Sequence, residues 1–196
     1  MVGEASLSGL TAGRGARVAV AAAALFVSAA GAETFVVSGG CRDGAPNGLY
    51  ELRMPDGRLR ITGAFAKGRR TGTFIFWAAN GARIALIPYD DDVKVGTVAV
   101  WYDPARAKAD PPRKSETAYV AGALHGIKRS WHPNGNPRTE FRYERGELAE
   151  ARAWMQRGAQ LSDTEARALA ARDVATDERF YATLETTIAE NLPRCE

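Results

Sequence analysis

The sequence predicts a mainly β protein, a single-sheet array of stacked β-hairpin repeats followed by a small C-terminal α-helical cap. Three observations lead to this fold class. Glycines recur at 48, 72, 96 and 126, at intervals of 24, 24 and 30 residues. The intervals contain runs in which apolar and polar residues alternate, as they do in strands. After Gly158 the alternation stops and helical spacing replaces it.

Residues 1–32 are predicted to be a signal peptide. Arg14 and Arg17 precede an apolar stretch that ends in Ala30-Gly31-Ala32, a pattern that signal peptidase accepts. The stretch is short of the roughly 20 apolar residues that a membrane span needs. An uncleaved anchor is the alternative, and it is the one way in which we expect membrane contact. We therefore expect a periplasmic or secreted bacterial protein that starts at Glu33.

The two cysteines, Cys41 and Cys195, lie near the two ends of the predicted mature chain. In an oxidising compartment they would form a disulfide. A zinc site would need four ligands at close spacing, and the sequence lacks them. A catalytic thiol with a histidine partner remains an open alternative.

The repeat domain is predicted to span residues 33–160. Its units are 48–71, 72–95, 96–125, 126–149 and a partial unit, 150–160. In the units with a short first turn, that turn carries Asp-Gly or Asn-Gly, which favours a tight hairpin. In the third unit Ala105 replaces the turn glycine, and a Pro-rich insertion follows. The second strands end at an aromatic residue: Phe65, Tyr89, Tyr119 or Tyr143. A lone hairpin is barely stable, so neighbouring hairpins must stack.

The helical cap is predicted over residues 161–196. Ser162 and Glu165 form a capping-box pattern that starts a first helix. Thr176-Asp177-Glu178 is expected to start a second helix, with an apolar stripe of Phe180, Leu184 and Ile188. The stripe either packs on the last hairpin and shields the sheet edge or binds a partner.

Neither histidine is expected to be catalytic or to bind metal. His125 takes the unit position that Thr71, Val95 and Ala149 take elsewhere, and His132 shares its position with Met54, Ala78 and Tyr102. Positions that accept such different residues impose no common chemistry. Asp90, Asp91 and Asp92 lack the alternating spacing of a calcium loop, so we expect a solvated turn. The sequence shows no catalytic motif, and we expect no cofactor and no enzyme activity.

Trp77, Trp101 and Trp131 take the sixth position of three successive units. They should therefore form a ladder on one face of the sheet, opposite the face that receives the third and fifth positions. The ladder is either structural stacking or a binding surface for a ligand or partner, and the sequence leaves both open.

The run from Tyr119 to Gly126, YVAGALHG, resembles the Y-x-x-G-x-x-x-G core of the MORN-repeat family. The 24-residue unit, with a tryptophan before an Asn-Gly turn, is similar to bacterial MORN-variant proteins of the YwqK antitoxin type. The resemblance covers residues 47–160, and it departs from the pattern at Asp92 and Glu150, which replace glycines. It implies stacked hairpins and an antitoxin-like binding role.

The function that we expect is that of a non-catalytic, exported repeat scaffold for protein–protein binding. Its partner is an unknown protein, with a toxin as one candidate. The alternative is an envelope structural or assembly protein that contacts peptidoglycan or a membrane surface, and an enzyme with a thiol or histidine centre ranks third. The net charge is only +3 and the basic residues are scattered, so we expect no nucleic-acid partner.

Overall fold

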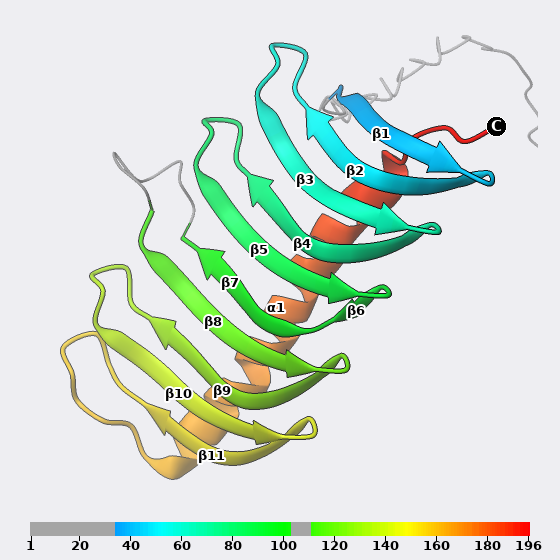
Figure 1. Ribbon diagram of the computed structural model, residues 1–196. Helices are drawn as coiled ribbons and strands as arrows, with labels where there is room; N and C mark the ends of the chain where they lie inside the picture. Colours follow the sequence, from blue (N-terminus) through cyan, green and yellow to red (C-terminus); the bar gives the residue numbers. More distant parts are fainter. Residues whose placement is uncertain (1–33, 103–110) are drawn as a thin grey trace, which may run out of the picture. The chain divides into compact units, whose positions relative to one another are not determined.

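The computed structural model describes residues 34–102 and 111–196. All of them lie within one compact unit, Glu33–Glu196. They form an eleven-stranded antiparallel sheet that remains open, with one C-terminal helix running along it (Figure 1). The predicted mainly β fold of stacked hairpins with a C-terminal helix is confirmed. The predicted signal peptide, residues 1–32, and Ala105 lie outside the described residues.

The strands follow one another across the sheet in chain order, except that the short β6 pairs only with β5. β1 and β11 are therefore the two edges. The strands are β1 (Val36–Arg42), β2 (Ala45–Arg53), β3 (Leu59–Ala66), β4 (Arg69–Trp77), β5 (Arg83–Asp90), β6 (Val93–Lys94), β7 (Gly96–Trp101), β8 (Arg113–Val120), β9 (Ala123–Trp131), β10 (Pro137–Glu144) and β11 (Glu147–Ala153), and the helix is α1 (Asp163–Glu190).

Two kinds of tight turn alternate along the chain. At one end of the sheet the turns place two successive residues at positive φ, as in Ala121-Gly122 and Asp91-Asp92. This conformation matches the twist of a two-residue hairpin. At the other end the same hydrogen-bond pattern recurs four times, around Gly57, Gly81, Gly135 and Gly158. The turn at Gly158 shows that the fifth unit keeps the turn geometry of the others.

A β-bulge recurs where each strand pair meets the second kind of turn. Pairing shifts by one residue after Leu52, Phe76, Val100 and Ser130. In the fourth unit the extra residue is Arg138, whose guanidinium donates to Asp173 of α1. The corresponding Ile84 packs against the core. The bulge therefore turns one residue toward the helix and leaves its neighbour on the opposite face.

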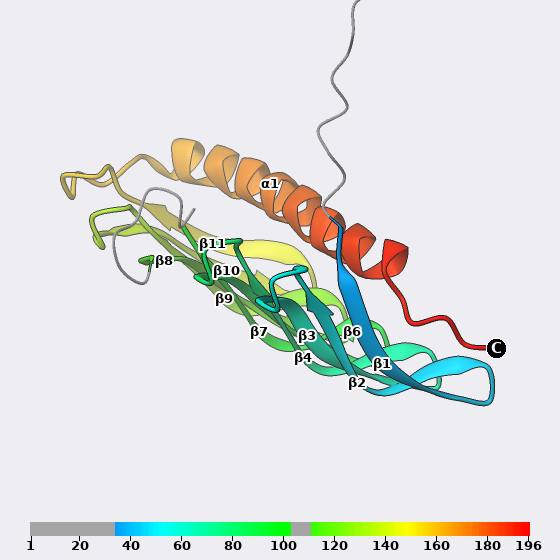
Figure 2. The ribbon, with the colours of Figure 1, turned by 90° about the horizontal axis from the view of Figure 1, so that it is seen from above.

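The core lies between the sheet and α1. Alternate residues of the strands are buried on this side, and aromatic rings from β2 to β5 contact one another edge to face. Tyr181, Leu184 and Ile188 of α1 pack on this cluster. The other half of the helix packs near Phe141 and Tyr143 of β10. The helix thus runs along the sheet from β11 toward β1, as Figure 2 shows from above.

The helix matches the repeat of the sheet. The hydroxyls of Tyr119 and Tyr89 donate to Glu178 and Glu185, at 3.0 and 2.7 Å. The tyrosines lie two strands apart, a spacing of about 9.6 Å. The glutamates lie seven residues apart, which spans about 10.5 Å along a helix. Because the two spacings are similar, one straight helix can make the same contact with successive hairpins.

The prediction of two helices was wrong. A single helix runs from Asp163 to Glu190, and the capping box between Ser162 and Glu165 starts it as expected. Thr176 is no cap, because its hydroxyl donates to the carbonyl of Arg172 inside the helix. Asp177 is buried against the sheet. The buried stripe runs through Tyr181 rather than Phe180, which is only partly buried.

The expectation that the C-terminal segment caps the last hairpin also needs correction. The first part of α1 contacts β11, and the rest of the helix covers the face of the sheet as far as the first hairpins. The return brings Cys195 to Cys41 of β1, and the two form a disulfide with a Cα–Cα distance of 5.6 Å. This predicted pairing is confirmed, and the bond joins the end of the chain to the first strand.

Within the described residues, no helix is long and apolar enough to cross a membrane.

Candidate binding face

The two faces of the sheet differ in what covers them. α1 lies along one face, which we call the helix face (Figure 2). The residues that alternate with the buried ones lie on the opposite side, which we call the open face. Among residues 34–102 and 111–196, no helix covers the open face. Exposed or half-buried side chains on this face are therefore the candidates for partner contact.

The three predicted ladder residues, Trp77, Trp101 and Trp131, lie on the open face at the ends of β4, β7 and β9. Each follows a strand residue buried on the helix side, and each is only partly buried. Trp154, just after β11, occupies the same place and is also partly buried. All four tryptophans of the chain therefore share one position in the repeat.

Trp154 was missed from the sequence because the fifth unit opens with Glu150 instead of glycine. A signal was nevertheless present. Gly158 follows Trp154 by four residues, as Gly135 follows Trp131 and Gly81 follows Trp77. Alignment on the turn glycine, rather than on the opening glycine, identifies the fourth tryptophan.

Arginines alternate with the tryptophans. Trp77 pairs across the strands with Arg83, and Trp101 pairs with Arg113. The guanidinium carbons of Arg83 and Arg113 lie 4.9 and 5.1 Å from the centre of the Trp101 ring system. The two cations therefore lie against Trp101 from β5 and β8, a cation–π arrangement. We call Trp77, Arg83, Trp101, Arg113, Trp131, Pro137 and Trp154 the tryptophan row.

A second row of charges runs beside the tryptophan row from β8 to β11. Arg113 forms an ion pair with Glu116 three residues along its own strand. Glu140 accepts from Arg129 at 3.0 Å and lies 3.8 Å from Arg152. Arg129 is directly opposite Glu116 on one side and Glu140 on the other. The charges of this part of the open face are thus alternately positive and negative across the strands.

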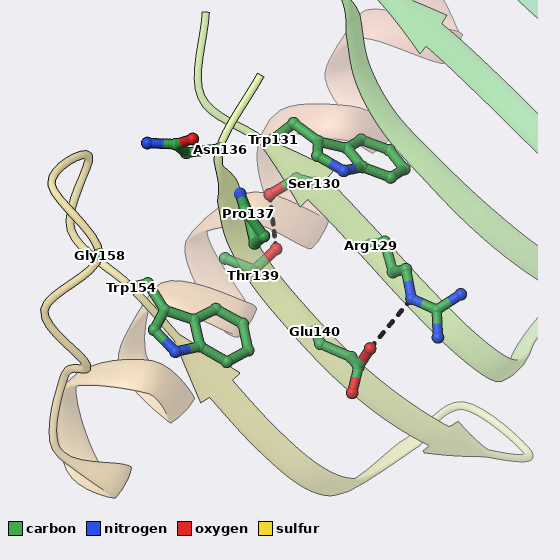
Figure 3. Close-up of a pocket in the computed structure, with 9 residues that line it drawn as sticks. All are labelled: Arg129, Ser130, Trp131, Asn136, Pro137, Thr139, Glu140, Trp154 and Gly158. Carbon is green, nitrogen blue, oxygen red and sulfur yellow. Dashed lines mark hydrogen bonds and ion pairs between the residues drawn. The ribbon is translucent and has the colours of Figure 1, made fainter. Parts of the chain in front are cut away.

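A cavity of about 580 Å³ lies between Trp131 and Trp154. In Figure 3 the two indoles stand on either side of β10, with Pro137 between them and the Arg129–Glu140 pair further along the strand. Asn136, Thr139 and Gly158 complete the lining, together with Ser130. We call this cavity the indole slot. Two large aromatic walls beside a charged pair make it suited to a group with both an apolar face and a charge.

Two hydrogen bonds hold the walls of the indole slot. The hydroxyl of Tyr102 donates to the carbonyl of Trp131 at 2.6 Å, and burial raises the pKa of this tyrosine. His132 Nε2 lies 2.9 Å from the carbonyl of Trp154. A carbonyl oxygen can only accept, so Nε2 carries the proton. Both bonds fix the backbone from which an indole projects.

His125 and His132 do not meet in a site. Nδ1 of His125 accepts from the backbone N–H of Arg145 at 3.3 Å, at the turn between β10 and β11. His132 bonds to Trp154 at the other end of the sheet. In the described ranges, no group of three or more His, Cys, Asp or Glu residues is placed to hold a metal ion. Asp91 and Asp92 form a tight turn at positive φ, and their carboxylates pair with Arg69 and Arg70.

Both cysteines of the chain are in the disulfide. A disulfide sulfur is not a thiolate, so the open alternative of a catalytic thiol lacks its nucleophile in this state.

A polar cavity of about 310 Å³ lies on the helix face, beneath α1. Its charged lining includes the ion pairs Lys128–Asp177 and Arg138–Asp173, together with Lys114. This cavity was not predicted from the sequence, although the third and fifth positions of the fourth unit, Lys128 and Ser130, are polar where the other units are apolar. Since the ion pairs join the helix to the sheet, we assign this cluster to the docking of α1.

Comparison with known protein families finds no family that matches the chain, and no curated protein matches it. The resemblance to the MORN-repeat family and its antitoxin-like variants stays a prediction from the sequence.

Proposed function

We propose that this protein is a non-catalytic, exported repeat scaffold that binds another protein through the tryptophan row. The observation that carries the proposal is that all four tryptophans lie in one line on the face that the helix leaves open. Tryptophan and arginine are the residues most enriched in the energetic centres of protein interfaces. The tryptophan row supplies both types on a rigid sheet, where little conformational entropy is lost on binding.

Export is supported by the disulfide between Cys41 and Cys195, because such bonds persist in oxidising compartments. A periplasmic or secreted location follows as part of the proposal. An antitoxin or immunity role is a more specific version of the proposed protein-binding function. It rests on the resemblance of the repeat units to antitoxin-like proteins. In this role the scaffold would cover a surface that the partner toxin needs for its action.

The alternative role, contact with peptidoglycan or a membrane surface, has one observation in its favour. Arginines of several strands lie on the open face, among them Arg53, Arg83, Arg113, Arg129, Arg142 and Arg152. Their positive charges would favour anionic polymers or lipids. Most of these arginines are paired with carboxylates or lie against Trp101, so the protein-binding role is better supported.

The test is to capture partners from a periplasmic extract with the oxidised protein, purify the captured protein and titrate it. We expect Trp101→Ala and Trp131→Ala to weaken its binding at least about tenfold, as truncation of an interface centre does. Arg179→Ala, on the exposed side of α1, is the matched control and should leave binding unchanged. Variants must keep the melting temperature of the parent.

The alternatives give different results in the same experiment. Co-sedimentation with cell-wall fragments or anionic vesicles, lost in high salt, would replace the protein-binding role with the envelope role. Affinity for the captured protein that survives both tryptophan variants would place the binding surface elsewhere. For the antitoxin form, the captured protein must inhibit growth when expressed alone, and co-expression of this protein must restore growth.

A further inference from the structure

We propose that the indole slot binds the guanidinium group of an arginine side chain presented by the protein partner. The inference rests on the proposed function and specifies the chemistry of one contact within it. Equivalent positions of successive repeats on the open face show what fills the space between two tryptophans elsewhere in the tryptophan row.

Between Trp101 and Trp131 the intervening strand β8 supplies Arg113. Its guanidinium lies against the Trp101 ring and is ion-paired with Glu116, three residues further along the strand. Between Trp77 and Trp101 the strand β5 supplies Arg83, which also lies against Trp101. In these two spaces of the tryptophan row, an arginine of the chain stands between the indoles.

Between Trp131 and Trp154 the intervening strand β10 supplies Pro137 in the place of Arg113. Pro137 is paired with Trp131 across the strands, as Arg113 is paired with Trp101. The carboxylate is retained, because Glu140 follows Pro137 by three residues, as Glu116 follows Arg113. A proline ring is too short to extend along the indoles, and the indole slot opens at this point.

The indole slot therefore has the same surroundings that hold an arginine guanidinium elsewhere in the tryptophan row. At the equivalent position, however, the chain carries Pro137 instead of an arginine. Two indoles form the walls, and Glu140 lies beside Trp154 and Pro137 in the lining. A planar guanidinium stacks on an aromatic face and pairs with a carboxylate through two parallel N–H groups. An ammonium group is more strongly hydrated and lacks the flat shape, so lysine fits less well.

Glu140 already contacts Arg129 and Arg152, so an incoming cation needs a way to reach it. The sheet provides one. Arg129 lies directly opposite Glu116 as well as Glu140, and its side chain is about half exposed. It can therefore turn toward Glu116, which gives the partner's arginine access to Glu140 beside Arg152.

The experiment uses the purified, oxidised protein and a blocked arginine, N-acetyl-arginine methylamide, as the probe. The four indole N–H signals are assigned by NMR from single Trp→Phe variants. On titration we expect saturable shifts of the Trp131 and Trp154 signals and little change at Trp77. The matching blocked lysine should bind at least about tenfold more weakly, because it lacks the stacking plane.

Three variants test the assignment. Pro137→Arg restores the residue found in the preceding unit, so its own guanidinium should fill the slot and abolish binding of the probe. Leu59→Arg makes the same charge change at the corresponding position of the first unit, beside Arg53, and should leave binding unchanged. Glu140→Gln should weaken binding of the blocked arginine but leave the indole N–H signals at the positions they have in the parent.

The inference is overturned if the blocked arginine gives no saturable shift, if blocked lysine binds equally well, or if Pro137→Arg binds the probe like the parent. Binding of a blocked tryptophan in preference to arginine would make the slot an aromatic site instead. These results are separable from those for the proposed function. If binding of the captured protein depends on Trp101 but blocked arginine does not compete with it, the scaffold function stands and the guanidinium site is ruled out.

Discussion

Lys128 of β9 and Asp177 of α1 form an ion pair between the sheet and the helix, with side chains that are only 2% and 11% exposed. Lys128 takes the unit position that holds Tyr50, Phe74 and Val98 in the other repeats. Its neighbours on the helix face are also polar, and its ammonium lies 3.4 Å from the hydroxyl of Thr117. At this position the fourth repeat therefore meets the helix with a charge, where the first three repeats present an apolar or aromatic side chain.

Removing one member of this pair should be costly. Asp177→Ala leaves a buried ammonium without its counter-ion, and we expect a loss of about 3–5 kcal/mol in the free energy of unfolding. The double variant Lys128→Val/Asp177→Leu, which copies the valine of the third repeat, should recover most of the loss. Urea unfolding at pH 7 measures both. If Asp177→Ala costs less than 1 kcal/mol, the pair is hydrated in solution and does not anchor the helix.

Much of the fold was predictable because its signals are local. Alternation and turn glycines lie within a few residues of one another, so they identified the hairpins and the capping box at Ser162. The second helix start was wrong because Thr176-Asp177-Glu178 has the composition of a cap. Asp177 instead pairs with Lys128, which lies 49 residues earlier in the chain. Nothing in the local pattern of the helix shows that Asp177 faces a lysine.

The candidate site was predictable in part for the same reason. The tryptophan positions follow from repeat alignment, and three of the four were identified. The indole slot depends on which residue stands between two tryptophans across the strands. That residue is set by the recurring bulge, which shifts the pairing by one and places Pro137 opposite Trp131. Such a shift is a property of the assembled sheet, so the repeat pattern alone does not predict the indole slot.

Gly63 is expected to be irreplaceable for a steric reason. A Cβ atom at this position would lie 2.5 Å from ring carbons of Phe74. Gly63→Ala should therefore destabilise the protein by about 1–3 kcal/mol through overpacking. Adding Phe74→Leu should relieve the clash, so the two changes should cost less together than the sum of each alone. Strict additivity in urea unfolding would show that the ring moves aside without cost.

The disulfide should make a large contribution to stability. Cys41 and Cys195 are separated by 154 positions, and chain entropy predicts about 5 kcal/mol for a loop of this length. For a protein of this size, reduction should lower the melting temperature by roughly 10–20 °C. Calorimetry of the oxidised protein and of Cys41→Ser/Cys195→Ser measures the difference. Two titratable thiols in protein taken from the periplasm would show that the bond does not form there.

Alkaline pH should unfold the protein by a specific route. Burial raises the pKa of Tyr50 to about 12 and that of Tyr143 to about 12. Burial also raises the pKa of Tyr89 and Tyr119, with further increases from Glu185 and Glu178. In the unfolded chain these hydroxyls titrate near pH 10. Their stabilisation is therefore complete below about pH 10 and is lost as the pH rises toward 12 and above.

The measurement is the free energy of unfolding at pH 9, 10 and 11, with absorbance at 295 nm to count ionised tyrosines. Each buried tyrosine should add about 1.4 kcal/mol per pH unit to the slope above pH 10. Tyr143→Phe removes one such group and should make the slope shallower. A stability that is flat up to pH 11 would contradict the burial of these hydroxyls.

The structure predicts different effects of substituting the two histidines, although neither was expected from the sequence to be catalytic or to bind metal. His125 accepts one hydrogen bond from an exposed turn, so His125→Ala should cost less than about 1 kcal/mol. His132 donates from a partly buried ring to the carbonyl of Trp154, and His132→Ala should cost about 1 kcal/mol. Because the carbonyl also fixes a wall of the indole slot, only His132→Ala should shift the Trp154 indole N–H signal. His132→Gln, whose amide can donate to the same carbonyl, should restore part of that signal's position. Loss of partner binding in His125→Ala at an unchanged melting temperature would reverse the assignment and give this histidine a functional role.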